Sequence, residues 1–375
     1  MAGNDYRHTL PAAWFHDPAH HRRELAAIWQ RDWLCAGRAE DWPETGDFRR
    51  LRVGDQQIVI TRDGDGALHA FHNTCRHRGS LLCEHDAGRF EGGRIVCPYH
   101  AWTYGLDGAL QRAPHSTAAD GLRLADFSLY RVRLDTWGGF VFVNLAADSA
   151  VPLETFLGTE AGNVAAWPLA ELRRVHRETH HLDCNWKVFW ENYLECYHCP
   201  GVHPDLCRLV PLYRTGYMDY AAAGVTRDPD RPHAMLRPGA VTWSSDGEAV
   251  LPWFAGLGEK ERQAGMTFAS FAPTLFLVAH VDYVRTVAVL PLGPEETGLT
   301  VDWFVHRDLL DHPALDVEAL IAFGSQVVRE DAHVCELNQA GIRCDRHAGG
   351  VLLQLEDHVY EFEQWVREKL DHAGG

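Results

Sequence analysis

Two short pairs of cysteine and histidine constrain the fold of this chain more than any other feature of its sequence. Cys75 and His77 form a C-x-H pair, Cys97 and His100 form a C-x-x-H pair, and 19 residues separate the pairs. Each pair follows a strand-like run, and Gly79 suits a tight loop after the first pair. We therefore expect a small β-rich domain in which two loops bring the four side chains together.

The ligand types in these loops favour one kind of metal centre. Two thiolates suit one iron and two imidazoles suit another, which is the mixed ligation of a Rieske [2Fe–2S] centre. The alternative is a structural zinc site with two cysteines and two histidines. Zinc fingers usually present a cysteine pair followed by a histidine pair, whereas each loop here carries one of each. The predicted cofactor-binding and metal ligands are Cys75, His77, Cys97 and His100.

A second concentration of metal-binding residues lies further along the chain, at 185–204. His198 and His203 are five residues apart, and Pro200 and Gly201 interrupt the helix between them, so the second histidine can curl back beside the first. Two imidazoles are two thirds of the 2-His-1-carboxylate triad of Fe(II) oxygenases, which leaves open positions for O2. The spacing alone is also compatible with two unrelated histidines at a helix end.

The carboxylate of such a triad must come from another segment, and Asp331 is the best candidate. It lies in a long predicted helix at 314–342, close to apolar residues such as Val328 and Cys335. A carboxylate among apolar neighbours is costly unless it binds a cation or a metal. The spacing also allows a solvated Asp331 beside Glu330, or one paired with an arginine.

Two E-x-x-H motifs offer a rival metal centre, as in di-iron four-helix bundles. They are Glu195-x-x-His198 and Glu330-x-x-His333. That fold needs four long helices, and the strand-rich stretch at 211–306 argues against it. Iron content separates the two interpretations, because a Rieske centre with a mononuclear site needs about three irons per chain and one with a di-iron site about four.

The remaining pattern predicts an α+β protein. Helices are expected at 18–33, 185–199, 314–342 and 355–371, and strand-like segments at 45–145 and 211–306. A hairpin is expected around the GDG at 64–66. The helix at 185–199 carries an aromatic stripe that is more typical of a core than of a cofactor site. The stripe consists of Trp186, Phe189, Trp190, Tyr193 and Tyr197.

The charge and the apolar runs exclude some classes of function. The net charge of −17 argues against nucleic-acid binding, which is driven by basic surfaces. No apolar run approaches the roughly 20 residues that span a bilayer, and the first residues lack the features of a secretion signal. We therefore expect a cytoplasmic protein that binds no membrane. In a reducing compartment, its ten cysteines are expected to bind metal or do chemistry more often than to form disulfides.

Together these motifs resemble the α subunits of Rieske non-haem iron oxygenases, the aromatic-ring-hydroxylating dioxygenase family. The likeness covers nearly the whole chain, through CRHRG, CPYHAWTY, NWK, ENYLECYHC, EDAHVCELNQAG and LEDHVYEFEQWV. It implies an all-β Rieske domain at 38–148, inserted in a helix-grip catalytic domain of antiparallel sheet and helices. The implied catalytic domain comprises an N-terminal helical segment at 1–37 and the mononuclear iron domain at 149–375.

The resemblance also implies roles for the residues. His198, His203 and Asp331 hold a mononuclear Fe(II). Glu195, three residues before the first iron histidine, bridges the two metal centres across a subunit boundary, and Asn192 is a second catalytic candidate. No G-x-G-x-x-G follows a strand, so a separate NAD(P)H-dependent flavin or iron–sulfur reductase, or a ferredoxin, is expected to supply electrons. O2 and a small molecule are the implied substrates, and a homotrimer is the implied assembly.

The glutamate at 195 points to one branch of the family, because many ring-dihydroxylating members have aspartate there. In this respect the chain resembles the branch of choline, glycine betaine, carnitine and stachydrine monooxygenases. The sequence HVDYV at 280–284 departs from that branch at Val281, where proline is expected. This likeness implies N-demethylation or hydroxylation of a quaternary ammonium or N-methylated compound. Hydroxylation or cis-dihydroxylation of an aromatic ring, and a pure electron carrier, remain alternatives.

Aromatic side chains that could hold a quaternary ammonium by cation–π contact are concentrated at 243–283. Because alternate aromatic residues in strands usually pack inward, we expect only two or three of them to line a substrate pocket. The candidates are Trp243, Trp253, Phe254, Phe268, Phe271 and Tyr283.

Overall fold

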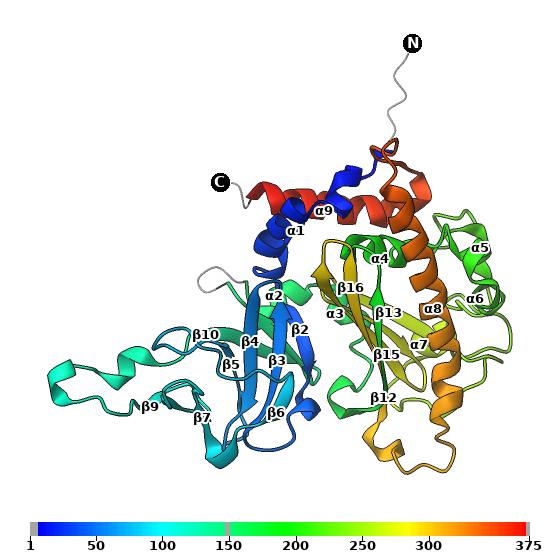
Figure 1. Cartoon of the computed structure of the whole chain (residues 1–375). Coiled ribbons are helices and arrows are strands. Elements are labelled where there is room, and N and C mark those ends of the chain that lie inside the picture. Colours follow the sequence, from blue (N-terminus) through cyan, green and yellow to red (C-terminus); the bar gives the residue numbers. More distant parts are fainter. Residues whose placement is uncertain (1–6, 147–150, 373–375) are drawn as a thin grey trace. The chain divides into compact units, whose positions relative to one another are not determined.

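The computed structural model describes residues 7–146 and 151–372. It divides into two compact units, which Figure 1 shows coloured along the chain. The β unit comprises residues 29–156, and the mixed unit comprises residues 1–28 together with 157–375. The β unit is thus an insertion in the sequence of the mixed unit. The predicted α+β class, with an all-β unit inserted in one of sheet and helices, is confirmed.

The β unit contains two antiparallel sheets. The larger sheet has the strand order β2-β11-β10-β5-β4-β3-β6 and the smaller one the order β7-β8-β9. The large sheet consists of β2 (Leu34–Arg38), β3 (Asp47–Val53), β4 (Gln56–Arg62), β5 (Leu68–His72), β6 (Ala87–Arg89), β10 (Arg131–Trp137) and β11 (Phe140–Asn144). The small sheet consists of β7 (Arg94–Val96), β8 (Thr103–Gly105) and β9 (Leu110–Arg112). The predicted hairpin at 64–66 joins β4 to β5.

The apolar core of the β unit extends to both Cys/His loops. Phe48, Phe71 and Tyr104 belong to this core, and so do Cys75 and Cys97. Packing therefore fixes the base of each loop, since both cysteines are anchored in the same cluster of buried side chains.

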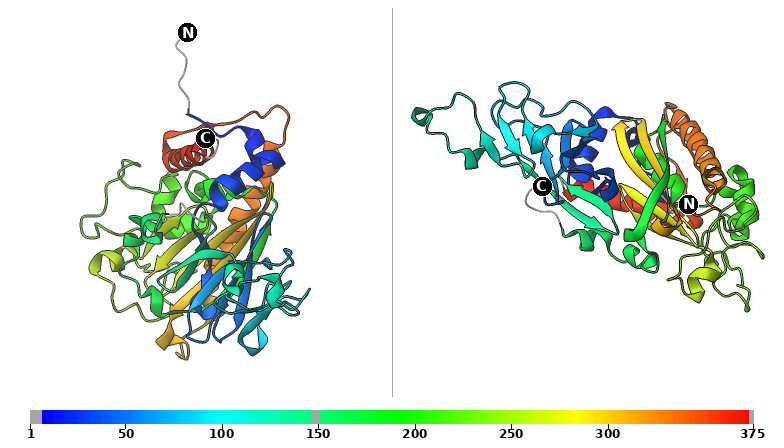
Figure 2. Two further views of the ribbon diagram at one scale, coloured as in Figure 1. Left: turned by 90° about the vertical axis from the view of Figure 1, so that its left-hand side faces the viewer. Right: turned by 90° about the horizontal axis from the view of Figure 1, so that it is seen from below.

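The mixed unit is built around one five-stranded antiparallel sheet of order β12-β16-β15-β14-β13. Its strands are β12 (Leu172–Leu182), β13 (Met266–Phe271), β14 (Leu275–His280), β15 (Val284–Gly293) and β16 (Glu296–His306). The long helix α8 (Val317–Ile342) packs against β12 and against α4 (Trp186–Tyr193). Helix α9 (Asp357–His372) lies beside α1 (Pro18–Glu24) in both orientations of the molecule (Figures 1 and 2). The sheet and α8 together place the residues discussed below.

The NWK motif explains how α4 begins and where it is anchored. Asn185 is the N-cap, and its side-chain oxygen accepts a hydrogen bond from the Lys187 amide at 3.0 Å. Trp186 Nε1 and Lys187 Nζ both donate to the buried carboxylate of Glu24, at 2.9 Å and 2.5 Å. These residues tie α4 to the N-terminal segment, so the motif stabilises the fold next to the site.

Some predicted elements differ in the structure. The helix predicted at 18–33 ends at Trp29, with a last turn of π type, and the helix predicted at 185–199 ends at Tyr193. Tyr197 is 55% exposed, so the last member of the aromatic stripe is not core. In the turn after the helix, the Glu195 side chain accepts a hydrogen bond from the His198 amide at 3.1 Å.

The strand-rich stretch is also shorter than predicted. Strands begin at Met266, and no strand occurs at 216–258, a described segment rich in Gly, Pro and Asp. Within the described ranges, no helix is long and apolar enough to cross a membrane.

Candidate metal centres

The two loops of the β unit bring the predicted cluster residues together. His77 Nδ1 and His100 Nδ1 lie 3.2 Å apart, and both rings are exposed. Cys75 and Cys97 are 3% and 2% exposed, beneath the histidines in the core of the unit. The loops therefore present two imidazole nitrogens at their tips and two thiols at their bases.

Backbone hydrogen bonds close the two loops in the same way. The Gly79 amide donates to Cys75 O at 2.9 Å, and the Ala101 amide donates to Cys97 O at 3.0 Å. Gly79 and Ala101 both have positive φ, +79° and +56°. The alanine is the less usual residue in this conformation, so the second loop depends on its surroundings more than the first.

The donor set fits a Rieske [2Fe–2S] cluster. Burial raises the pKa of the Cys75 thiol, so a thiolate at this position needs a cationic partner. Tyr104 OH lies 3.2 Å from Cys75 Sγ and accepts a hydrogen bond from the Arg76 amide at 3.1 Å. Its own proton is thus free to be donated to sulfur. Two thiolates and two imidazoles are the donors that would hold a Rieske [2Fe–2S] cluster, and its iron would supply the positive charge.

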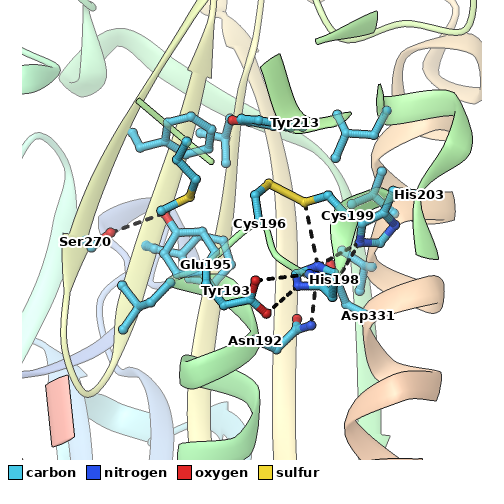
Figure 3. Close-up of a pocket in the computed structure, with 18 of the residues that line it drawn as sticks. Asn192, Tyr193, Glu195, Cys196, His198, Cys199, His203, Tyr213, Ser270 and Asp331 are labelled. Carbon is cyan, nitrogen blue, oxygen red and sulfur yellow. Dashed lines mark hydrogen bonds and ion pairs between the residues drawn. A yellow bond between two sulfur atoms is a disulfide. The ribbon is translucent and has the colours of Figure 1, made fainter. Parts of the chain in front are cut away.

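In the mixed unit, the side chains of His198, His203 and Asp331 converge on one point (Figure 3). His203 Nε2 lies 3.2 Å from His198 Nε2 and 2.8 Å from Asp331 Oδ1. The third distance, between His198 Nε2 and Asp331 Oδ1, is 3.4 Å. Two nitrogens and one carboxylate oxygen so close together fit the 2-His-1-carboxylate set of a mononuclear iron.

Two separate elements supply these three groups. Both histidines flank α5 (Cys199–Val202), a short turn of helix after α4, while Asp331 projects from α8. The His203 amide donates to Cys199 O at 2.9 Å, a helical hydrogen bond that brings His203 back beside His198. Pro200 and Gly201 lie inside α5, so the prediction that they interrupt a helix between the histidines is wrong, and the break comes earlier, between Tyr193 and Cys199.

Each histidine is held from behind by its own carboxylate. His198 Nδ1 donates to Glu195 Oε1 and His203 Nδ1 donates to Glu330 Oε2, both at 2.7 Å. Burial lowers the pKa of His198, but the hydrogen bonds to Asp331 and Glu195 outweigh this effect and raise the pKa to about 9. In the neutral, metal-binding form of each histidine, such partners fix the tautomer that leaves the Nε2 lone pair facing the other ligands, and they strengthen metal binding.

A cavity of about 380 Å³ opens onto the three converging side chains. Asn192 and Glu195 lie in its wall beside His198, with Asn192 Nδ2 3.5 Å from His198 Nε2 (Figure 3). Its aromatic lining comprises Phe189, Tyr193, Tyr213, Trp243, Phe268 and Phe276. Glu160 and Arg285 add one charge of each sign.

The sequence matches two families. Residues 169–372 match the family described as ring hydroxylating alpha subunit (catalytic domain), and residues 32–130 match the Rieske [2Fe-2S] domain. The first match alone covers more than half of the chain. The chain belongs to the Rieske oxygenase α subunits. It is an oxidoreductase of the kind that incorporates oxygen from O2, and the cofactors of this family are a Rieske [2Fe–2S] cluster and a mononuclear iron.

This oxygenase is similar over nearly its whole length to characterised members. It is 30% identical to the glycine betaine monooxygenase oxygenase subunit of Chromohalobacter salexigens, over 97% of this chain and 86% of that protein. It is 29% identical to the chloroplastic choline monooxygenase of Beta vulgaris, over 96% of this chain and 77% of that protein. A crystal structure of a quaternary ammonium Rieske monooxygenase superposes with a TM-score of 0.75 and 23% identity, over 98% and 97% of the two chains, which shows the shared fold.

The two rival metal sites do not fit this oxygenase. His333 is exposed and is not among the converging ligands, so the second E-x-x-H motif does not build a di-iron centre. The helices of the mixed unit flank a sheet rather than forming a bundle. The family match likewise replaces the zinc interpretation of the Cys/His loops.

The predicted substrate residues need revision. Trp243 and Phe268 line the cavity, but four other candidates do not: Trp253, Phe254, Phe271 and Tyr283. Phe254, Phe271 and Tyr283 are buried in the core, and Trp253 lies at a shallow depression elsewhere on the surface. Phe189 and Tyr193, which their helical stripe assigned to the core, line the cavity instead. A helical stripe cannot distinguish a core from a cavity wall, because both exclude water.

One pair of cysteines takes the less frequent of the two expected outcomes. Cys196 and Cys199, on either side of His198 in the chain, form a disulfide. The two residues are three apart at a tight turn with 4.9 Å between their Cα atoms, which is within reach of a disulfide.

Proposed function

We propose that this oxygenase monooxygenates a small quaternary ammonium or N-methylated compound, by N-demethylation or hydroxylation. One observation carries the proposal: a cavity lined by aromatic residues and by Glu160 opens directly onto His198, His203 and Asp331. The glycine betaine and choline monooxygenases among its relatives support the same substrate class.

The lining of the cavity suits a cation that has no N–H to donate. A trimethylammonium group is held by aromatic faces, each contributing about 0.5–2 kcal/mol, and by nearby carboxylates. Tyr193 and Phe276 stack with ring centroids 3.7 Å apart, and Tyr193 OH lies 3.2 Å from Ser270 Oγ. These contacts hold the rings in place before a ligand arrives.

In this proposal the ligands are those predicted from the sequence. Cys75, His77, Cys97 and His100 hold the cluster in a Rieske domain at 38–148. His198, His203 and Asp331 hold the iron in a catalytic domain made of 1–37 and 149–375. The bound cluster supplies single electrons, and the bound iron supplies the place where O2 is activated.

The other residues around the iron ligands orient groups and exclude water. Glu195 and Glu330 hold the two histidines in the tautomer whose Nε2 carries a lone pair. The Asn192 side-chain amide can donate a hydrogen bond next to the iron ligands, since its Nδ2 lies 3.5 Å from His198 Nε2. The apolar lining keeps bulk water from the reacting carbon, which protects reactive oxygen species from unproductive loss.

Glu195 is also the proposed bridge between the two centres, in a homotrimer in which electrons cross between subunits. Its carboxylate already accepts from an iron-ligating histidine, and a carboxylate has room for a second donor. The exposed rings of His77 and His100 are suitable donors from another subunit. A related crystal structure is described as revealing inter-subunit electron transfer, which supports this route. We place the protein in the cytoplasm, with a separate NAD(P)H-dependent reductase or ferredoxin as electron donor.

The experiment that tests the substrate class compares choline with 3,3-dimethylbutan-1-ol, which has the same shape but no charge. Calorimetry on the oxygenase without reductase should show tighter binding of choline by roughly tenfold or more, the sum of two or three cation–π contacts. Equal affinity for the two, or tighter binding of a flat arene, would favour hydroxylation of an aromatic ring in aromatic hydrocarbon catabolism. The fold is compatible with that alternative, because a naphthalene 1,2-dioxygenase from Rhodococcus superposes with a TM-score of 0.70 at 20% identity.

A further inference from the structure

Arg285 is an unusual residue in the wall of the cavity. It lies on β15, is 4% exposed, and is the one charged residue of that strand. Among the described residues that line the cavity, it is the only arginine or lysine. A buried guanidinium is costly unless acceptors surround it, so its partners are informative.

The hydrogen bonds of Arg285 are few. A guanidinium has five N–H donors, yet the described residues provide one acceptor, Gly324 O, at 3.0 Å from Nη1. Its Nε is buried without an acceptor. By contrast, the fully buried Lys187 donates to three oxygens: Trp14 O, Asn185 Oδ1 and Glu24 Oε1. The fold thus satisfies one buried cation and leaves the other short of acceptors.

The nearest acids do not compensate for this deficit. Asp331 and Glu178 stabilise the charge of Arg285 from a distance, although burial lowers the pKa of the guanidinium overall. Asp331 Oδ1 faces His203 Nε2 at 2.8 Å. Glu178 Oε1 accepts from Ser325 Oγ at 2.6 Å, and its other oxygen lies 3.1 Å from His180 Nε2. Neither carboxylate forms an ion pair with Arg285 in the described structure.

The structure nevertheless makes room for this side chain. A Cβ on Gly324 of α8 would lie 3.3 Å from Arg285 Cδ and 3.3 Å from Nη1, tighter than an ordinary contact. The ring of Trp243 lies on another side, with its centroid 5.7 Å from the guanidinium carbon. Helix, strand and tryptophan therefore hold the guanidinium against the cavity, whose occupant can supply further acceptors.

We propose that Arg285 binds the carboxylate of a zwitterionic substrate, so that the preferred ligand carries a trimethylammonium group and a carboxylate on one short skeleton. This inference rests on the proposed function and narrows its substrate class. A guanidinium matches a carboxylate through two parallel N–H···O bonds, which a hydroxyl group cannot reproduce. The aromatic rings and Glu160 then hold the ammonium group, while Arg285 fixes the opposite end and orients the methyl groups.

Four ligands of similar shape separate the two recognition elements. Glycine betaine has the ammonium group and the carboxylate, choline has the ammonium group alone, 3,3-dimethylbutanoate has the carboxylate alone, and 3,3-dimethylbutan-1-ol has neither. Their binding to the metal-loaded oxygenase is measured by calorimetry without reductase, so that no turnover occurs. The variants are Arg285→Gln and, as a control that removes the same charge from an exposed position, Arg307→Gln.

We expect the native protein to bind glycine betaine about 10- to 100-fold more tightly than choline, the range typical of a charge-assisted hydrogen-bonded pair. Arg285→Gln should abolish this advantage and weaken 3,3-dimethylbutanoate to a similar extent, while choline binding changes less than about threefold. Arg307→Gln should behave like the native protein. Arg285→Lys keeps the positive charge but loses the two parallel N–H donors of the guanidinium. It should retain only part of the preference for glycine betaine over choline.

Two results would overturn the inference: no preference of the native protein for glycine betaine over choline, or equal weakening of both by Arg285→Gln, which would show a structural role. If Arg285→Gln does not fold, the native protein's preference and the Arg285→Lys variant still decide. Failure of the proposed function looks different. The carboxylate ligands would keep their advantage, but each ammonium ligand would bind no better than its tert-butyl counterpart.

Discussion

The two metal-binding regions of this oxygenase differ in how their ligands are assembled and exposed. The cluster residues come from two neighbouring loops of one small unit, and their histidines lie at the surface. The iron residues come from elements far apart in sequence, since Asp331 follows His203 by 128 residues, and His203 is 1% exposed. A centre that receives electrons from other proteins must be accessible, whereas one that oxygenates a substrate must be enclosed. The predictions below test this division of labour.

Removing the carboxylate that joins the two halves of the iron site should have the largest effect. Asp331→Ala should lose the mononuclear iron and leave the cluster intact. Activity should fall by more than the 10- to 100-fold loss that is typical when a residue hydrogen-bonded to a metal ligand is replaced. Iron analysis should fall from about three to about two atoms per chain, with an unchanged cluster spectrum. His333→Ala, an exposed neighbour on the same helix, should keep full iron content. A loss of iron in that control would revive the di-iron alternative.

Replacing a ligand of the exposed cluster should alter the cluster and leave the mononuclear iron in place. His100→Cys should shift the cluster towards all-thiolate ligation and lower its reduction potential by a few hundred millivolts, roughly the interval between Rieske and plant-type clusters. The Rieske spectral signature should disappear while the mononuclear iron stays bound. An unchanged spectrum would remove His100 from the ligand set. His77→Cys should give the same result.

The two carboxylates behind the iron histidines offer a matched comparison, because Glu195 and Glu330 make the same 2.7 Å contact to an Nδ1. Glu330→Gln should weaken iron binding about 10- to 100-fold, as expected for a residue that only orients a ligand. Glu195→Gln should show the same loss and in addition slow reoxidation of the reduced cluster in iron-saturated protein. If both variants reoxidise at equal rates on addition of substrate and O2, Glu195 is not the route between the centres.

The smallest effect concerns Tyr104, whose hydroxyl lies 3.2 Å from Cys75 Sγ. Tyr104→Phe removes a donor to sulfur and should lower the cluster potential on the order of 50 mV, since 59 mV corresponds to a factor of ten for one electron. Protein-film voltammetry measures the shift. Iron content and substrate affinity should not change, and a potential equal to that of the native protein would show that the hydroxyl does not donate to sulfur.

The same contrast explains what the sequence could predict. The cluster residues could be assigned from spacing, because each loop is local and its Cys and His lie within three residues of each other. Asp331 required the family resemblance, since spacing along one helix does not show which distant histidines it will meet. The strand-like segment predicted at 211–306 contains strands from Met266 onward, whereas the helix predicted at 185–199 is too long, because helical periodicity does not show where a helix ends.

The cavity wall was the least predictable part. Phe189 and Tyr193 carry the same helical periodicity as a core residue, and only the packing of α4 against the sheet decides which side faces a hollow. Arg285 did leave a signal, a single charge inside the apolar run of β15. A charge in such a position indicates either a buried ion pair or a ligand, and the structure is needed to see that none of the described residues is a partner acid.

The most direct test of this account is a single turnover of the oxygenase with both centres reduced, given O2 and either glycine betaine or naphthalene, with the organic products identified by mass spectrometry. Monooxygenation at a carbon beside nitrogen predicts formaldehyde and the demethylated amine from glycine betaine, and no oxygenated product from naphthalene. A dihydrodiol or naphthol from naphthalene, with glycine betaine recovered unchanged, would contradict it.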